Sequence, residues 1–241
     1  MLKITGYSWK IVIGGGGGVG KTTFINRYLG GEFTPDTKLT VGVQFHARME
    51  KINGYECNLA IWDLGGQDRF RFVQDNYIRG AVGAIVFFDM SRLNTLYQVE
   101  DWVNLIRKNA SPKIPIILGG TKNDLVPREK EGEIYDLVLE VLEDLGLNCF
   151  MATSSKTGSN VTAVMRNLVV TLIEARVERK PALSIIKPQE YTRLKYSPIF
   201  TDSEINYILP AVKSNLDPGE DLIKTELEKE KLKDFGLPEK I

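Results

Sequence analysis

The sequence has few cysteines, no excess of either charge and no long apolar run. Its two cysteines, Cys57 and Cys149, exclude a disulfide framework and are typical of a reducing compartment. The 31 lysines and arginines balance 31 acidic residues, so the composition does not favour a nucleic-acid partner. No run reaches the roughly 18 apolar residues of a membrane span, and residues 1–7 lack the apolar core of a secretory signal. We therefore expect a soluble, cytoplasmic protein.

Residues 9–176 alternate short apolar runs with longer helical patterns. Nearly continuous apolar runs are typical of strands that are covered on both faces of a parallel sheet. The alternation of such strands with helices predicts a doubly wound α/β fold with a mostly parallel sheet. The expected strands are 10–13, 56–62, 84–88 and 114–118, with a short run at 149–151, and the expected helices are 21–29, 96–107, 129–145 and 160–177.

The composition changes after Arg179, so we expect a domain at 1–179 and a partly helical C-terminal extension at 180–241. The extension holds more isoleucine, leucine and tyrosine than a disordered linker. Two interpretations of it stay open. Its apolar helices fold back on the domain or dock a partner, or it is a partly ordered segment with no part in regulation.

Residues 15–22 read G-G-G-G-V-G-K-T and fit the phosphate-loop pattern G-x-x-x-x-G-K-[ST] between a strand and a helix. Glycines let successive N–H groups face phosphate oxygens, and the following helix adds its positive end. Lys21 is placed to reach the β- and γ-phosphates, and the Thr22 hydroxyl to bind Mg²⁺. A flexible hinge explains the glycines but not the Lys-Thr pair. The predicted phosphate-binding residues are Gly15, Gly17, Gly18, Val19, Gly20, Lys21, Thr22 and Thr23.

Three further segments follow predicted strands in the order of the small GTPases of the Ras superfamily. Residues 63–67, D-L-G-G-Q, resemble the D-x-x-G motif with a following glutamine. Residues 121–124, T-K-N-D, resemble the base-reading N-K-x-D motif, although alone they also fit a turn before a helix cap. Residues 153–156, T-S-S-K, resemble the S-A-K loop. The resemblance implies a Ras-like G domain that binds GTP and GDP with Mg²⁺.

The same resemblance implies how guanine is read. Asp124 can accept both N1–H and the exocyclic amine of guanine, whereas adenine leaves that carboxylate unpaired. Thr121, where most members have Asn, predicts a weaker brace on the phosphate loop with guanine binding retained. The residues expected around the base are Phe33, which braces the ring, Thr121, Lys122, whose stem lies along the base, Asp124, Ser154, Ser155, whose N–H meets O6, and Lys156.

The resemblance also implies the residues of the reaction. Gln67 is expected to orient the attacking water, the alternative being an ordinary loop glutamine. Thr22 and Thr40 are expected to bind Mg²⁺, Asp63 to hold a metal-bound water and the Gly66 N–H to contact the γ-phosphate. Release of Thr40 after γ-phosphate loss is the expected switch. The first switch has no arginine, so we expect slow hydrolysis that an activating protein's arginine accelerates by about 10³–10⁵.

Several segments resemble the Rab branch of the superfamily, among them residues 41–45 and 76–81. They contain Phe45, Trp62 and Tyr77, which match the aromatic triad that Rabs present to effectors; for Trp62, core packing is the alternative. Exchange factors, activating proteins and effectors are expected at this triad and at the switches. Residues 63–67 instead resemble Arf-type members. No cysteine follows Cys149 and no glycine follows Met1, so we expect no lipid anchor and membrane contact only through a partner.

The leading hypothesis is a GTP-hydrolysing switch in trafficking or signalling. A scaffold that holds the nucleotide with negligible hydrolysis is the alternative. A phosphate-loop kinase is a third, which residues 63–67 and the lack of an arginine-rich lid segment disfavour.

Overall fold

The computed structural model describes residues 6–35, 39–66, 71–147 and 149–177, with only the backbone for 71–73. These residues belong to the first of two units of the chain, Met1–Ser184. The predicted extension at 180–241 and the predicted catalytic Gln67 lie outside the described residues. The elements follow in the order β1 (Gly6–Gly15), α1 (Lys21–Tyr28), β2 (Val43–Ile52), β3 (Tyr55–Leu64), α2 (Arg71–Ile78), β4 (Gly83–Asp89), η2 (Leu93–Gln98), α3 (Val99–Asn109), β5 (Ile116–Thr121), η3 (Asn123–Leu125), α4 (Arg128–Leu145), β6 (Phe150–Ala152) and α5 (Val161–Arg176), where η marks a 3₁₀ helix.

The six strands form one sheet in the order β2-β3-β1-β4-β5-β6. All neighbouring pairs are parallel except β2 and β3, so the predicted mostly parallel α/β fold is confirmed. β1 lies between β3 and β4. The chain first forms β2 and β3 on one side of β1 and then β4, β5 and β6 on the other, so the strand order reverses at β1. Ligands of doubly wound sheets bind outside the carboxyl ends of the strands at such a reversal of strand order.

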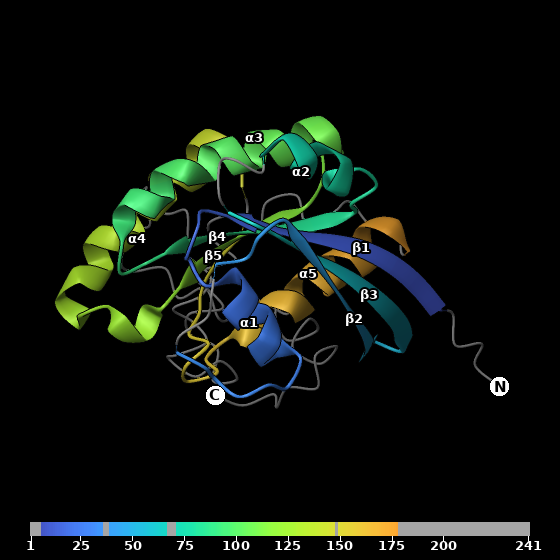
Figure 1. Cartoon of the computed structure of the whole chain (residues 1–241), viewed down its shortest axis with the longest axis horizontal. Coiled ribbons are helices and arrows are strands. Elements are labelled where there is room, and N and C mark those ends of the chain that lie inside the picture. Colours follow the sequence, from blue (N-terminus) through green and yellow to red (C-terminus); the bar gives the residue numbers. More distant parts are fainter. Residues whose placement is uncertain (1–5, 36–38, 67–70, 148, 178–241) are drawn as a thin grey trace, which may run out of the picture. The chain divides into compact units, whose positions relative to one another are not determined.

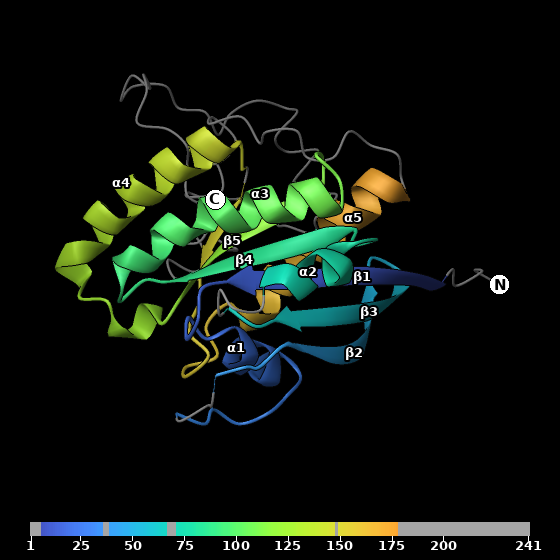
Figure 2. The ribbon, with the colours of Figure 1, turned by 45° about the horizontal axis from the view of Figure 1, so that its top comes forward.

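Helices cover both faces of the sheet. Figures 1 and 2 show α2 and α3 over one face and α1 and α5 over the other. Every residue of β4 and β5 is buried, which explains their continuous apolar runs. Phe24 of α1 packs on Phe87 of β4 with ring centroids 4.6 Å apart, and this contact ties the first helix to the centre of the sheet. No helix in the described ranges is long and apolar enough to cross a membrane.

Among the strands and α-helices, two were not predicted by range from the sequence, the edge strand β2 and the eight-residue helix α2. The side chains of β2 alternate between exposed and half-buried, because one edge and much of one face meet solvent, so its apolar signal is weak. The helix predicted at 96–107 begins instead at Val99, since Leu96 lies in η2. The strand predicted at 114–118 is β5, which begins instead at Ile116. It starts after Pro115, because proline has no N–H to donate to a neighbouring strand.

The Phe24–Phe87 contact makes a prediction about stability. Phe87 is fully buried, and Phe87→Ala leaves a cavity between α1 and β4, so we expect the free energy of unfolding to fall by about 3–5 kcal/mol. Urea denaturation followed by circular dichroism measures this loss. The control Tyr97→Ala removes a ring that is 85 % exposed and is expected to change stability by less than about 0.5 kcal/mol. Similar losses in both variants would contradict the packing described above.

Candidate functional site

A cleft of about 610 Å³ lies outside the carboxyl ends of the parallel strands. It brings together residues that follow β1, β3, β5 and β6, as the strand order leads one to expect. The predicted residues on its wall are Gly17, Gly18, Gly20, Lys21, Thr22, Thr23, Phe33, Thr40, Gly66, Thr121, Lys122, Asp124, Ser155 and Lys156. Sequence reasoning missed three lining residues, Pro35, Leu39 and Leu125, which stand beside predicted segments. Four other predicted residues, Gly15, Val19, Asp63 and Ser154, are buried behind the wall.

The glycine-rich loop turns into α1 at Gly20, whose φ of 100° lies in the left-handed region that favours glycine. No side chain among the described residues caps this start of the helix. The first N–H groups of a helix need partners from outside it, and Thr22 and Thr23 line the cleft here. The helix start therefore suits an anion such as a phosphate group.

Lys21 places a positive charge at the same point. Only 5 % of this residue is exposed, and its Nζ donates to the carbonyl oxygens of Gly15 at 2.7 Å and Gly16 at 2.8 Å. Burial lowers the pKa of Lys21 to about 8, although the nearby Asp63 carboxylate opposes this shift. A phosphate bound in the cleft would add a negative partner in direct contact with this ammonium group, beside the nearby Asp63 carboxylate.

Oxygen atoms from three segments meet next to Lys21. The hydroxyl of Thr22 lies 2.6 Å from that of Thr40 and donates to Oδ2 of Asp63 at 2.5 Å. Asp63 is fully buried, and its Oδ1 has no hydrogen-bond partner among the described residues. Burial raises the pKa of Asp63, while the Thr22 hydroxyl and the Lys21 charge oppose the rise. Mg²⁺ in proteins usually binds a small number of protein oxygens together with phosphate oxygens and water. The oxygens of Thr22, Thr40 and Asp63 therefore fit that ion.

At the other end of the cleft, Thr121 and Asp124 have partners that connect separate loops. The Thr121 hydroxyl lies 2.5 Å from the carbonyl oxygen of Val19 and 3.0 Å from that of Phe88, so it links the phosphate loop to β4. Asp124 accepts a hydrogen bond of 2.6 Å from the buried hydroxyl of Ser154. Ser154 thereby orients the carboxylate rather than lining the cleft.

A model of the Ras family matches residues 10–174. The chain belongs to the Ras family. It is 37 % identical over 163 residues to the Ras-related protein RABA5a of Arabidopsis thaliana, covering 68 % of this chain and 72 % of that protein. It is 36 % identical over 166 residues to Ras-related protein Rab-11A of Dictyostelium discoideum, covering 69 % and 76 %. Ras-related protein Rab11A of Nicotiana tabacum is 32 % identical over 196 residues, 79 % of this chain and 89 % of that protein. These relatives confirm the predicted Rab-like small GTPase, a class that binds GTP and GDP and hydrolyses GTP to GDP.

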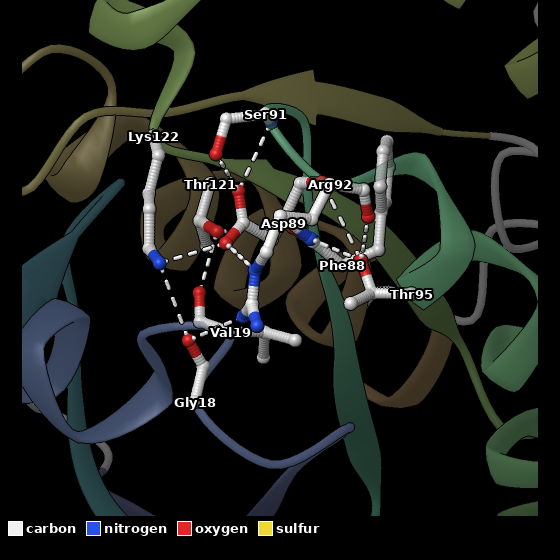
Figure 3. Close-up of polar contacts among 9 residues, drawn as sticks. All are labelled: Gly18, Val19, Phe88, Asp89, Ser91, Arg92, Thr95, Thr121 and Lys122. Atoms are coloured by element: carbon white, nitrogen blue, oxygen red, sulfur yellow. Dashed lines mark hydrogen bonds and ion pairs between the residues drawn. The ribbon is translucent and has the colours of Figure 1, made fainter.

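Sequence reasoning missed a charged cluster behind the phosphate loop of this Ras-family domain (Figure 3). Asp89 is fully buried, and its Oδ1 accepts hydrogen bonds from the backbone N–H and the hydroxyl of Ser91. Its Oδ2 contacts Arg92 Nε at 2.8 Å and Lys122 Nζ at 2.7 Å. Burial alone would raise the pKa of Asp89, but these contacts lower it below its usual value. The sequence feature that could have pointed to Asp89 is its position at the carboxyl end of an apolar strand.

The three predicted Rab-like aromatic residues meet on the surface formed by β2, β3 and α2. The ring of Trp62 lies 5.3 Å from that of Phe45 and 5.5 Å from that of Tyr77, between ring centroids. Phe45 is 56 % exposed, so the group reaches solvent. The ammonium group of Lys10 lies 4.5 Å from the centroid of the Trp62 ring.

Lys21 predicts a pH dependence of nucleotide binding. Its pKa is about 8 in the nucleotide-free protein, and a bound polyphosphate favours the charged form and raises that pKa. Above pH 8 the free protein has therefore lost a proton that the complex keeps, so binding takes up a proton and affinity falls as pH rises. Calorimetry of GDP binding in two buffers of different ionisation enthalpy should show an uptake that grows from pH 7 to pH 9, by at most about one proton. In Lys21→Arg the side chain stays charged, so the increase in proton uptake between pH 7 and pH 9 should disappear. The same increase in this variant would contradict the assignment of the proton to Lys21.

Proposed function

We propose that this chain is a Rab-like molecular switch whose cleft holds GTP or GDP and whose Thr40 segment reports which of them is bound. The observation that carries the proposal is the meeting of Thr22, Thr40 and Asp63 beside the buried Lys21. It joins the start of α1, the segment before β2 and the end of β3 at one point. A ligand at that point touches all three segments, so exchange of GTP for GDP changes the contacts that join them.

Each end of the nucleotide has its own set of groups in this proposal. Lys21 and the N–H groups of residues 17–23 hold the phosphates. The carboxylate of Asp124 reads the donor pair of guanine, and Phe33 braces the ring. Thr22 and Thr40 would hold Mg²⁺, with Asp63 holding a metal-bound water, and the ion would neutralise charge on the phosphates. We assign this G domain to residues 1–179 and treat 180–241 as an extension of separate function.

The proposed role of Gln67 is to orient the attacking water. Gly66, the residue before it, lies against the phosphate loop so closely that a Cβ there would collide with the backbone of Gly16 and Gly17. The segment is held from the other side by Gln74, whose side-chain amide donates to the carbonyl oxygen of Gly65 at 2.7 Å. Gly66 thus lies beside the expected γ-phosphate position. Orientation of water and stabilisation of charge are the main demands of this reaction.

The partners that we propose are regulators and effectors that contact the switches and the cluster of Phe45, Trp62 and Tyr77. Support comes from the exposure of aromatic rings that pack on one another, an arrangement typical of interface anchors. We propose the cytoplasm as the compartment, since Cys57 and Cys149 are both free thiols.

Phosphate release from GTP tests the hydrolytic switch. With Mg²⁺ and no partner, the purified protein is expected to release phosphate slowly, below about 10⁻² s⁻¹, because no partner supplies an arginine. Gln67→Leu should slow release by about tenfold or more while the protein still binds GTP. Binding without release in both forms would favour the scaffold that holds the nucleotide. Fast release by the wild type would contradict the need for an external arginine.

Tryptophan fluorescence tests whether the aromatic cluster senses the nucleotide. Trp62 packs between residues from β2 and α2, so we expect its emission to change when GDP is exchanged for a non-hydrolysable GTP analogue. Trp62→Phe should abolish most of this change. Trp9→Phe is the control, because Trp9 is buried in β1 and should leave the change intact. A change that survives Trp62→Phe would argue against a sensing role.

A further inference from the structure

The phosphate loop of this chain has an unusual run of five glycines, Gly14–Gly18. Glycine loses more backbone freedom on ordering than any other residue, and such a run has no side chains to hold itself in place. Its contacts therefore come from elsewhere. The ring of Trp102 lies against Gly14, the carboxamide of Gln98 against Gly16, and the guanidinium group of Arg92 near Gly18. These three side chains come from one stretch, η2 and the start of α3.

Arg92 holds the loop by its backbone. Its Nη2 donates to the carbonyl oxygen of Gly18 at 2.9 Å, while its Nε is fixed by Asp89 at 2.8 Å (Figure 3). Lys122 donates to the same carbonyl oxygen at 3.3 Å. In a trans peptide the carbonyl and the next N–H point in opposite directions. A Gly18 carbonyl held on the side of Asp89 therefore turns the N–H of Val19 to the opposite side, and the two cations strengthen that N–H as a donor.

Gln98 holds the loop by occupying space. Its Oε1 lies against Gly16, within 2.0 Å of the place of a Cβ, so this flexible side chain would have to move for any side chain at position 16 to fit. The φ of Gly16 lies outside the left-handed region, so the backbone itself does not demand glycine at this position. Gln98 immediately precedes α3, but its side chain does not cap that helix. The contact that the structure gives this side chain is the one with Gly16.

We propose that Arg92 and Gln98, at the two ends of η2, are positioning residues that hold Gly16–Gly18 in the shape that binds nucleotide phosphates. They supply from outside the rigidity that side chains within the loop would otherwise provide. Arg92 orients the peptide between Gly18 and Val19, and Gln98 packs on the chain at Gly16. This inference rests on the proposed function, because it assumes that phosphates occupy the cleft.

The first test measures dissociation of a fluorescent GDP analogue from Arg92→Met. We expect dissociation to be about 10- to 100-fold faster than from the wild type, because one charged hydrogen bond to the loop is lost. The ³¹P resonance of the bound β-phosphate should move, while the preference for GDP over inosine diphosphate, which reports on Asp124, stays unchanged. Arg166→Met makes the same chemical change on the exposed face of α5 and should match the wild type.

The second test uses rescue by a methyl group. Gln98→Ala removes an uncharged, exposed side chain, so the protein is expected to fold, and GDP dissociation should rise about 3- to 10-fold. Adding Gly16→Ala in that background should bring the rate back toward the wild type. The new methyl group then has room, with Val19 Cγ1 at 3.6 Å, and it restricts the loop. A purely structural effect of Gln98 on α3 would not respond to this methyl group.

The outcomes separate this inference from the function on which it rests. A wild-type protein that fails to retain GDP would overturn both. A wild type that retains GDP, with unchanged dissociation from Arg92→Met and Gln98→Ala, would overturn the inference alone. The inference would also be overturned if the variant with both Gln98→Ala and Gly16→Ala released GDP as fast as Gln98→Ala alone. The same holds if Arg92→Met released GDP faster only in proportion to a loss of thermal stability, with the β-phosphate resonance unmoved.

Discussion

Two opposite charges buried at the carboxyl edge of the sheet, Lys21 and Asp63, are the constraint on which the rest of the site depends. A buried charge is tolerated only when other groups satisfy it. Lys21 has two carbonyl oxygens of the phosphate loop, and Asp63 has the Thr22 hydroxyl, with one carboxylate oxygen that has no hydrogen-bond partner among the described residues. The glycine-rich loop, the start of α1 and the end of β3 all meet here because they carry these charges and their partners. A phosphate and a divalent cation, the ligands that we propose for this site, would satisfy these groups.

The segment before β2 joins this centre by far weaker means. Thr40 reaches Thr22 through one hydroxyl contact of 2.6 Å, while its neighbours Leu39 and Val41 are 56 % and 66 % exposed. One such hydrogen bond contributes about 1 kcal/mol, and the Gly65 N–H adds another to the carbonyl oxygen of Gly42 at 2.8 Å, so among the described residues few hydrogen bonds hold the segment in this position. A segment at this low end of local stability is suited to switching, because a small change in ligand charge decides its state.

The opposite side of the phosphate loop is held much more firmly. The Asp89 cluster connects the end of β4 to the loop through Arg92 and to the base-reading segment through Lys122. Thr121 adds a second connection between the same elements. One side of the cleft is therefore a rigid frame, and the other carries the segments that we propose to change with the nucleotide. That division is what a nucleotide-dependent switch requires, since the ligand must stay bound while the surface around it rearranges.

The sequence by itself determined the parallel α/β fold and the order of the four nucleotide motifs, because both depend on local spacing. Apolar runs of the right length predict buried strands. Glycines and a Lys-Thr pair between a strand and a helix predict the phosphate loop. Only the tertiary structure decided which distant side chains support those motifs. Ser154 on Asp124, Gln98 against Gly16 and Arg92 on Gly18 join residues 30 to 82 positions apart. The edge strand β2 also emerged only there, because its pairing with β3, not its own apolar pattern, makes it a strand. Contacts of this kind depend on how the sheet order brings loops together, which no short stretch of residues encodes.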